Sequence, residues 1–334
     1  MKASEYRKSL EEAPKKPYNL VILSHDEGDD SNDTGELVKK VANGMGVKTF
    51  LGEFRGLYEE NRMLNSFPVE DGKTIYPTPK SVGRGESQYD KPFPISPEDT
   101  IIMARGVGRP GLSGNHSWYD KCKKWEHEGY TLINGTKCHD LCSNKVMTQM
   151  IFERENINTP KTVLIAHSED TERALKELGS KFPIILKTGT GTNGIGVILV
   201  ESEPSLKAMI QLLYRESEFQ DILLQEYIKA DYDVRVIVFK DEVIGVMKRP
   251  VVSGDFRSNV SQGAKPVPHK LTEMETKESI RAAQAVDGVI VGVDFIPGKN
   301  PYFIEVNNVP GLVGIEEALE GSIVKKLLNK IKEM

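Results

Sequence analysis

The chain has 334 residues, of which 38% are hydrophobic and 28% are charged, and its formal net charge is −5. This length and composition predict two or three packed domains and argue against general disorder. Acidic residues outnumber Lys and Arg by 49 to 44, so a protein that coats nucleic acid or a membrane surface is not expected. No apolar run is long enough to cross a bilayer, and the N-terminal stretch lacks the apolar core of a secretory signal. We therefore expect a cytoplasmic protein.

The three cysteines, Cys122, Cys138 and Cys142, cannot all pair within one chain, and reduced thiols are the simplest interpretation. The spacing of Cys138, His139 and Cys142 leaves a structural metal site open as an alternative. No second Cys-x-x-Cys pair supports that alternative.

The first half of the chain predicts an α/β domain over residues 18–134, preceded by a polar, flexible tail at residues 1–17. The helix begins after Thr34 and stops at Gly46, and residues 52–98 show no clear periodicity. The β-α-β start implies a parallel sheet. The expected elements are strands at 20–23, 47–51, 100–104 and 131–133 and helices at 35–45 and 118–128.

The second half, residues 135–334, alternates differently and begins at the turn dipeptide Asn134-Gly135. Thr272 and Glu275 form a capping box at the start of a helix. The expected helices are 143–155, a helix capped by Ser168 that ends at Gly179, 205–214, 272–286 and 323–331. The expected strands are 162–166, 184–187, 196–200, 222–227, 234–239, 243–247, 289–296 and 302–307.

Two segments, 106–111 and 189–194, match the dinucleotide pattern G-x-G-x-x-G. The second lies between two predicted strands, so it is the tip of a hairpin whose backbone N–H groups would fold over phosphates, with a plain turn as the alternative. A nicotinamide oxidoreductase would instead need the loop to open a helix. The first segment follows a strand, where Arg105 and Arg109 would bind a substrate carboxylate unless they are merely solvated.

The most informative pattern lies near the C-terminus. Side chains alternate across a strand, so Glu305 and Asn307 share one face, and Asp294 on the preceding strand can share it too. Oxygen ligands of these types suit Mg²⁺ or Mn²⁺ completed by phosphate oxygens. The alternative is a carboxylate pair that is neutralised by Lys or Arg.

Other polar residues stand at strand ends or in the long loop at 249–271 and are weaker signals. Lys187 would reach phosphates, Asp233 would accept from ribose hydroxyls, and Gln225–Ile228 would present backbone groups to a purine. Arg249 and Arg257 suit the negative charge that develops in phosphoryl transfer.

From about Asn134 to Glu317, the sequence motifs and their order along the chain resemble the ATP-grasp superfamily and, within it, the RimK-like ligases. The matching blocks are Lys145, Ile165–Thr171, Ile184–Lys187, Gly191–Val197, Gln225–Lys229, Gly254–Asn259, Gly292–Asp294 and Glu305–Glu316. The resemblance implies two α+β subdomains that grip ATP, a lid part at about 135–220 and a metal-binding part at about 221–334, preceded by a Rossmann-like domain. It also implies ligation of a carboxylate to an amine through an acyl phosphate, with ATP and two Mg²⁺ or Mn²⁺ ions.

The resemblance assigns roles residue by residue. Lys145, Lys187 and the loop residues Gly191, Thr192, Asn193 and Gly194 would hold the phosphates. Glu226 and Tyr227 would read adenine, and Asp233 would bind the ribose. Arg257, Ser258 and Asn259 would face the γ-phosphate with Arg249 as a helper, and Asp294, Glu305 and Asn307 would hold the metal.

Three functions remain open at this point. The first is a ligase that adds an amino acid, such as glutamate, to a peptide, a protein tail or a small amino acid. The second is a glutathione-synthetase-like or carrier-protein ligase, and the third is an ATP-binding regulator without turnover. Small-molecule and peptide partners are expected, without nucleic acid or membrane. Members of the resembled family often assemble, so a homo-oligomer is left open, and the sequence does not give the oligomeric state.

Overall fold

The computed structural model describes residues 18–24, 30–53, 95–105, 116–189, 196–216, 221–251 and 265–334. The predicted flexible tail at 1–17 lies outside this part of the chain. The protein divides into two compact units. One comprises Met1–Val107, Asp120–Ile133 and Val324–Met334, and the other comprises Gly108–Tyr119 and Asn134–Ile323.

The first unit contains a four-stranded sheet in the order β2-β1-β3-β4, and every neighbouring pair is parallel. Its strands are β1 (Asn19–Ser24), β2 (Lys48–Glu53), β3 (Thr100–Ala104) and β4 (Thr131–Ile133), and its helices are α2 (Asp30–Gly44) and most of α3 (His116–His127) and α10 (Ile323–Lys332). The predicted parallel sheet is confirmed. Helix α2 begins at Asp30, five residues earlier than predicted.

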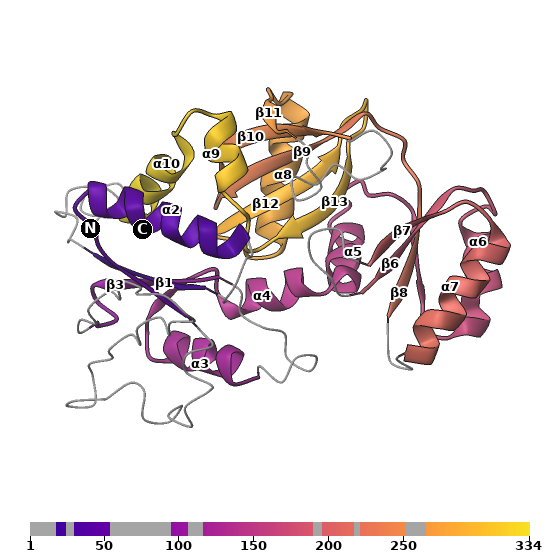
Figure 1. The fold of residues 1–334 in the computed structure, drawn as a ribbon, viewed down its shortest axis with the longest axis horizontal. Helices are drawn as coiled ribbons and strands as arrows, with labels where there is room; N and C mark the ends of the chain where they lie inside the picture. Colours follow the sequence, from indigo (N-terminus) through magenta and orange to yellow (C-terminus); the bar gives the residue numbers. More distant parts are fainter. Residues whose placement is uncertain are drawn as a thin grey trace, which may run out of the picture. The chain divides into compact units, whose positions relative to one another are not determined.

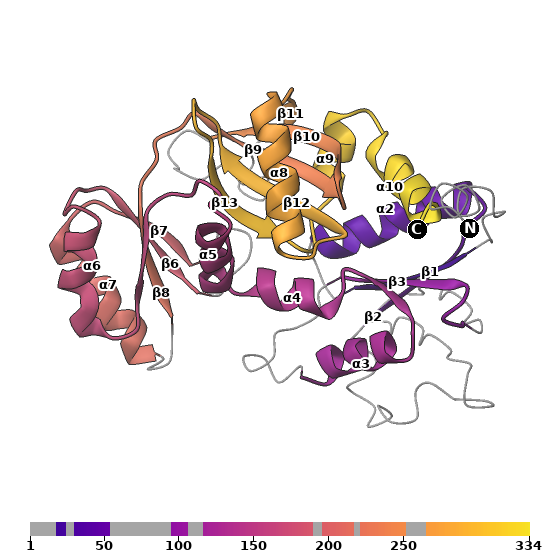
Figure 2. The same ribbon diagram turned by 180° about the vertical axis from the view of Figure 1, so that it is seen from behind.

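The second unit contains two antiparallel sheets, seen in Figures 1 and 2. The four-stranded sheet has the order β5-β8-β6-β7 and packs one face against α6 and α7 through a buried aliphatic cluster. Its elements are β5 (Thr162–Ile165), β6 (Ile184–Thr188), β7 (Val197–Val200), β8 (Ile222–Glu226), a 3-10 turn η2 (Ser168–Asp170), α6 (Thr171–Glu177) and α7 (Glu203–Glu216).

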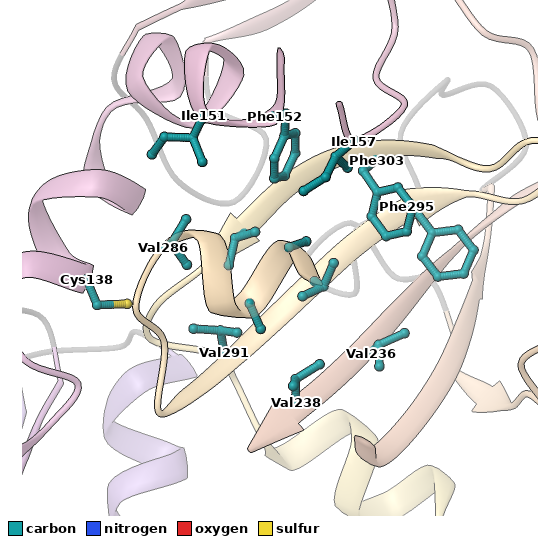
Figure 3. Close-up of a cluster of buried hydrophobic side chains, with 14 of the residues drawn as sticks. Cys138, Ile151, Phe152, Ile157, Val236, Val238, Val286, Val291, Phe295 and Phe303 are labelled. Atoms are coloured by element: carbon teal, nitrogen blue, oxygen red, sulfur yellow. The ribbon is translucent and has the colours of Figure 1, made fainter. Parts of the chain in front are cut away.

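The five-stranded sheet has the order β11-β10-β9-β12-β13, and helix α8 lies along one of its faces in both views. Its elements are β9 (Tyr232–Phe239), β10 (Glu242–Pro250), β11 (Val267–Pro268), β12 (Ile290–Ile296), β13 (Tyr302–Asn307) and α8 (Glu273–Ala285). Figure 3 shows the core beneath α8, where alternate residues of three strands, including Val236, Val291 and Phe303, pack together. The capping box of Thr272 and Glu275 is confirmed.

The opposite face of this sheet is approached closely by α9 (Val313–Ala318). A Cβ at Gly245 would lie 3.0 Å from Ile315 Cδ1 and 2.5 Å from Ile323 Cδ1, so glycine lets these two side chains approach the strand without moving. The residues that precede those of the core in each strand face this side, because side chains alternate along a strand.

Three parts of the second unit differ from the sequence-based prediction. The helix expected at 143–155 is confirmed as α5 (Lys145–Arg154), but a further helix that was not predicted, α4 (Thr136–Ser143), precedes it and is separated from it by Asn144. The side chain of Asn144 accepts from the Val146 N–H at 2.8 Å, so it caps α5 and starts a new helix. The short elements α9 and β11 were not predicted. Within the described ranges, no helix combines the length and apolar character that crossing a bilayer requires.

Candidate active site

Charged and amide side chains gather on the face of the five-stranded sheet that is opposite to α8. They stand at alternating positions with the valines and phenylalanines of the core, so the same period that buries the core places these residues together. The set comprises Asp233 and Arg235 on β9, Arg249 on β10, Asp294 on β12, and Glu305 and Asn307 on β13.

The three predicted metal ligands lie on adjacent strands. Asp294 is the register partner of Glu305, and Asn307 is the partner of Gly292, which has no side chain to fill the space. The register shifts between Asp294 and Phe295, so a bulge brings Glu305 to the face of Asp294 while Phe303 stays in the core. The expectation that these residues share one face is therefore confirmed.

The oxygen atoms of these ligands have different surroundings. The Asn307 Oδ1 accepts from the Val309 N–H at 2.9 Å, which fixes the direction of the amide. Among the described residues, the carboxylate of Glu305 has no direct hydrogen-bond or ion-pair partner, and Lys187 is close enough to feel its charge. A half-buried carboxylate without a direct partner is suited to bind a cation.

Asp294 is paired with two arginines. Arg235 donates from Nε and Nη2 to the two carboxylate oxygens at 2.8 and 2.7 Å, and Arg249 Nη2 lies 3.0 Å from Oδ2. Burial alone would raise the pKa of Asp294, but the two guanidinium groups hold it below its ordinary value. Asp294 is thus an ionised carboxylate in a fixed orientation.

Arg235 is a residue of this face that the sequence-based prediction did not include. It follows Asp233 by two positions and therefore shares its face of β9, which was the available signal. Arg249, predicted as a helper, binds both oxygens of Asp233 at 2.7 and 2.6 Å. Two arginines and two aspartates thus form a continuous buried chain of ion pairs. The alternative of carboxylates neutralised by arginine holds for Asp294 but not for Glu305.

The four-stranded sheet of this unit contributes Lys187. This residue lies near the end of β6, on the face away from α6 and α7. Burial lowers the pKa of Lys187 to about 8, Glu305 opposes the shift, and Lys145 adds to it. The three residues therefore lie near one another, although they come from β6, β13 and the start of α5. Lys145 is tied to the same place, because its N–H donates to Gly189 O at 3.0 Å.

The remaining predicted residues fall in three places. Glu226 ends β8, where its N–H donates to Lys161 O at 2.9 Å, and Tyr227 directly follows the strand. Arg105 is buried at the carboxyl end of β3 in the first unit. The other predicted residues lie outside the described part of the chain: Arg109, Gly191, Thr192, Asn193, Gly194, Arg257, Ser258 and Asn259.

The strands on either side of the glycine-rich segment pair with each other. Lys187 on β6 is the antiparallel partner of Val197 on β7. The segment therefore joins two strands of a hairpin and does not open a helix, as a dinucleotide-binding fingerprint requires. The oxidoreductase alternative is thereby excluded for this motif.

The cysteines do not assemble the alternative metal site. In the part of the chain that the structure describes, no three His, Cys, Asp or Glu side chains form a metal-binding group. The Sγ atoms of Cys138 and Cys142 lie 3.9 Å apart as free thiols. The Cys138 hydrogen bond and burial raise the pKa of Cys142 well above its ordinary value.

The oxygen-rich face fits a magnesium ion bound to polyphosphate. Two carboxylates and one amide oxygen on adjacent strands are hard ligands of the type that Mg²⁺ prefers. Mg²⁺ is commonly bound by one or two carboxylates with substrate phosphates completing its octahedron. Arg235, Arg249 and Lys187 add positive charge beside these ligands, as an anionic phosphate chain requires.

Comparison with known proteins agrees with this geometry. Residues 142–331, more than half of the chain, match the RimK-like ATP-grasp domain. A Rhodopirellula baltica protein named probable alpha-L-glutamate ligase is 34% identical over 189 residues, which are 56% of this chain and 46% of that protein. A Chromohalobacter salexigens protein of the same name is 34% identical over 244 residues, which are 72% of this chain and 78% of that protein. The chain spans less than two thirds of some of these relatives, including 65% of the Stutzerimonas stutzeri protein and 63% of the Photobacterium profundum protein.

A solved structure shares the fold. The ATP-grasp ligase PsnB, in complex with a phosphomimetic variant of its minimal precursor, Mg and ADP, matches with a TM-score of 0.65 at 15% identity, over 94% of this chain and 98% of that one. This structural likeness shows the ATP-grasp fold. The sequence match over residues 142–331 identifies the family within that fold as the RimK-like one. The chain belongs to the RimK-like ATP-grasp family.

Proposed function

We propose that the protein is an ATP- and Mg²⁺-dependent ligase that joins a carboxylate to an amine through an acyl phosphate. The observation that carries the proposal is the grouping of Asp294, Glu305 and Asn307 on one face of the sheet. Arg235, Arg249 and Lys187 lie beside this group. A protein that only binds nucleotide has no need for so many buried charges, because each is costly to bury.

The chemistry consists of two displacements. An oxygen of the substrate carboxylate attacks the γ-phosphorus of ATP, the bond to the bridging oxygen breaks, and ADP leaves. The amine nitrogen then attacks the acyl carbon, the bond from that carbon to the phosphate oxygen breaks, and the nitrogen loses a proton. The products are an amide, ADP and phosphate.

The residues of this chain would act mainly through charge and position. Bound Mg²⁺ would neutralise phosphate oxygens and stabilise the charge that develops on them. Arg235 and Arg249 would orient Asp294 and Asp233, to which their guanidinium groups are already bound, and would add positive charge near the phosphoryl oxygens. Lys145 and Lys187 would hold the phosphates, Asp233 the ribose, and the backbone groups of Glu226 and Tyr227 the adenine. Arg257, Ser258, Asn259 and residues 191–194 are proposed for the phosphates, and Arg105 and Arg109 for the second substrate.

The substrate class that we propose is an amino acid, with glutamate first, and the carboxylate of a peptide, a protein tail or a small amino acid. The relatives named as glutamate ligases support glutamate, and the peptide precursor bound to PsnB supports a peptide. The division at residue 134, the cytoplasmic location and the use of two metal ions remain part of this proposal.

The experiment is an ADP-release assay with ATP, Mg²⁺, glutamate and a panel of amino acids and peptides, with mass spectrometry of the products. We expect ADP formation that requires both substrates, and a product mass equal to the two substrates less one water. Glu305→Gln should abolish both signals. Nucleotide binding without ADP formation across the panel would instead indicate a regulator.

A further inference from the structure

Asn134, just before the first turn of α4, uses its whole hydrogen-bonding capacity inside the second unit. Its Oδ1 accepts from the N–H groups of Val289 and Ile290 at 2.7 and 3.0 Å. Its Nδ2 donates to Ile290 O at 2.7 Å and to Asn308 O at 2.6 Å. Because the side chain is buried, these bonds are not replaced by water. Asn134 therefore ties the start of β12 to the residue that follows β13.

Asn308, whose main-chain oxygen is bound by Asn134, is also held at its side chain by His139. The Nδ2 of Asn308 lies in hydrogen-bond contact with Nδ1 of His139. Burial lowers the pKa of His139 to about 4, against a smaller opposing effect of the Asn134 backbone. The ring is therefore neutral at pH 7, and we assign its proton to Nε2, so that Nδ1 accepts from the Asn308 amide. Asn308 is held at its main chain by Asn134 and at its side chain by His139.

Asn308 directly follows Asn307, the last residue of β13. The Asn307 Oδ1 accepts from the Val309 N–H on the other side of Asn308. Any rotation of the main chain at residue 308 therefore changes the direction of the Asn307 amide. None of Asn134, His139 and Asn308 has a place in the proposed chemistry. The buried Asn134 amide uses all of its donors and acceptors, whereas His139 Nε2 is buried without a hydrogen-bond partner among the described residues. The four bonds of Asn134 and the one contact of His139 Nδ1 are therefore the interactions that hold Asn308 in place.

We propose that Asn134 and His139 are positioning residues that fix Asn308, and thereby hold the Asn307 amide oxygen beside Asp294 and Glu305 for the divalent cation. This inference rests on the proposed metal site and goes beyond it, because it assigns a role to residues that contact neither metal nor nucleotide. Partners that orient metal ligands typically change metal affinity about 10–100-fold when they are removed.

The test is the gain in ADP affinity that Mg²⁺ produces, measured by calorimetry as the ratio of the affinities with Mg²⁺ and with EDTA. We expect His139→Leu to reduce this ratio about tenfold and to leave the affinity in EDTA unchanged. His139→Gln retains a group that pairs with the Asn308 amide and should restore most of the ratio. Tyr214→Phe, which removes a hydrogen bond to Ile165 O on the other sheet, should leave both affinities unchanged.

Asn308→Ala provides a second variant in case His139→Leu does not fold. Asn308 is half-buried, and its main-chain bond to Asn134 survives the change. A folded Asn308→Ala or His139→Leu protein with the wild-type ratio would overturn the inference, as would equal losses with Mg²⁺ and with EDTA. If the ADP affinity of the wild-type protein were the same with Mg²⁺ and with EDTA, the proposed metal site itself would be refuted. Failure of the metal site can therefore be distinguished from failure of the positioning role.

Discussion

Arg235 grips both oxygens of Asp294 from the neighbouring strand, with Nε to Oδ1 at 2.8 Å and Nη2 to Oδ2 at 2.7 Å. The two residues are register partners of β9 and β12. A proposed metal ligand is thus oriented by a guanidinium that stands on the adjacent strand, and the first prediction tests this relationship.

Arg235→Lys should damage the site even though it keeps the charge, because an ammonium cannot replace the two-pronged contact. We expect the Mg²⁺-dependent gain in ADP affinity to fall about tenfold and the free energy of unfolding to fall by about 1–3 kcal/mol. Calorimetry and denaturant unfolding measure the two effects. Arg173→Lys, the same change at an exposed ion pair with Glu177, is the control and should alter neither.

Glu305→Gln and Asp294→Asn should differ in stability although both should abolish turnover. By sequence alone, both variants should leave the fold intact. The structure revises this for Asp294, whose neutralisation leaves Arg235 and Arg249 with less compensation for their charges. We expect Asp294→Asn to lose about 3 kcal/mol of unfolding free energy. Glu305→Gln should change it by less than about 0.5 kcal/mol, and equal losses in both would contradict the ion-pair chain.

Lys187→Met should make the protein more stable while it weakens nucleotide binding. The pKa of Lys187 is lowered to about 8 in the folded protein, so its charged form opposes folding below pH 8. Between pH 8 and the ordinary pKa of lysine the folded protein loses this proton first, and the penalty disappears as the pH rises. We expect a gain of at most about 3 kcal/mol at pH 7 that shrinks towards pH 10.5, measured by denaturant unfolding at several pH values. A gain that is independent of pH would contradict the assignment.

The affinity for ADP should also depend on the charge of Lys187. Binding of phosphates favours the protonated ammonium, and the free protein loses this proton above about pH 8. Affinity measured in EDTA should therefore fall with rising pH, by up to about tenfold per unit above pH 8. Lys187→Met should show a lower affinity that is flat over this range, and a wild-type profile that is flat to pH 9.5 would refute the prediction.

Several parts of the site could be predicted from local sequence. The hairpin of β12 and β13 follows from alternation on both sides of the Pro297–Asn300 turn, and the two-residue period puts Glu305 and Asn307 on one side. The capping box of α8 is a contact between residues three positions apart. Each of these features depends on neighbours in the chain, so the sequence contains all the information needed.

Other parts could not be predicted because they join distant segments. Asn134 was interpreted as a turn residue and His139 as a possible metal ligand, yet their partners stand at 289–290 and 308. Helix α4 was not predicted, because no side chain caps its start and because Asn144 ends it and begins the next helix.

The sequence by itself determined which residues share a face where a strand is regular, since that depends only on the two-residue period of an extended chain. Only the structure showed the bulge in the pairing of β12 with β13, by which Glu305 lies on the face of Asp294 while Phe303 lies in the core. Only the tertiary structure decided that β9 pairs with β12, and therefore that Arg235 meets Asp294. It also brought Lys187 near Glu305 from a different sheet. The physical reason is that the order of strands in a sheet depends on how whole hydrophobic faces pack. A local sequence pattern therefore does not show which charged residues will be neighbours on adjacent strands.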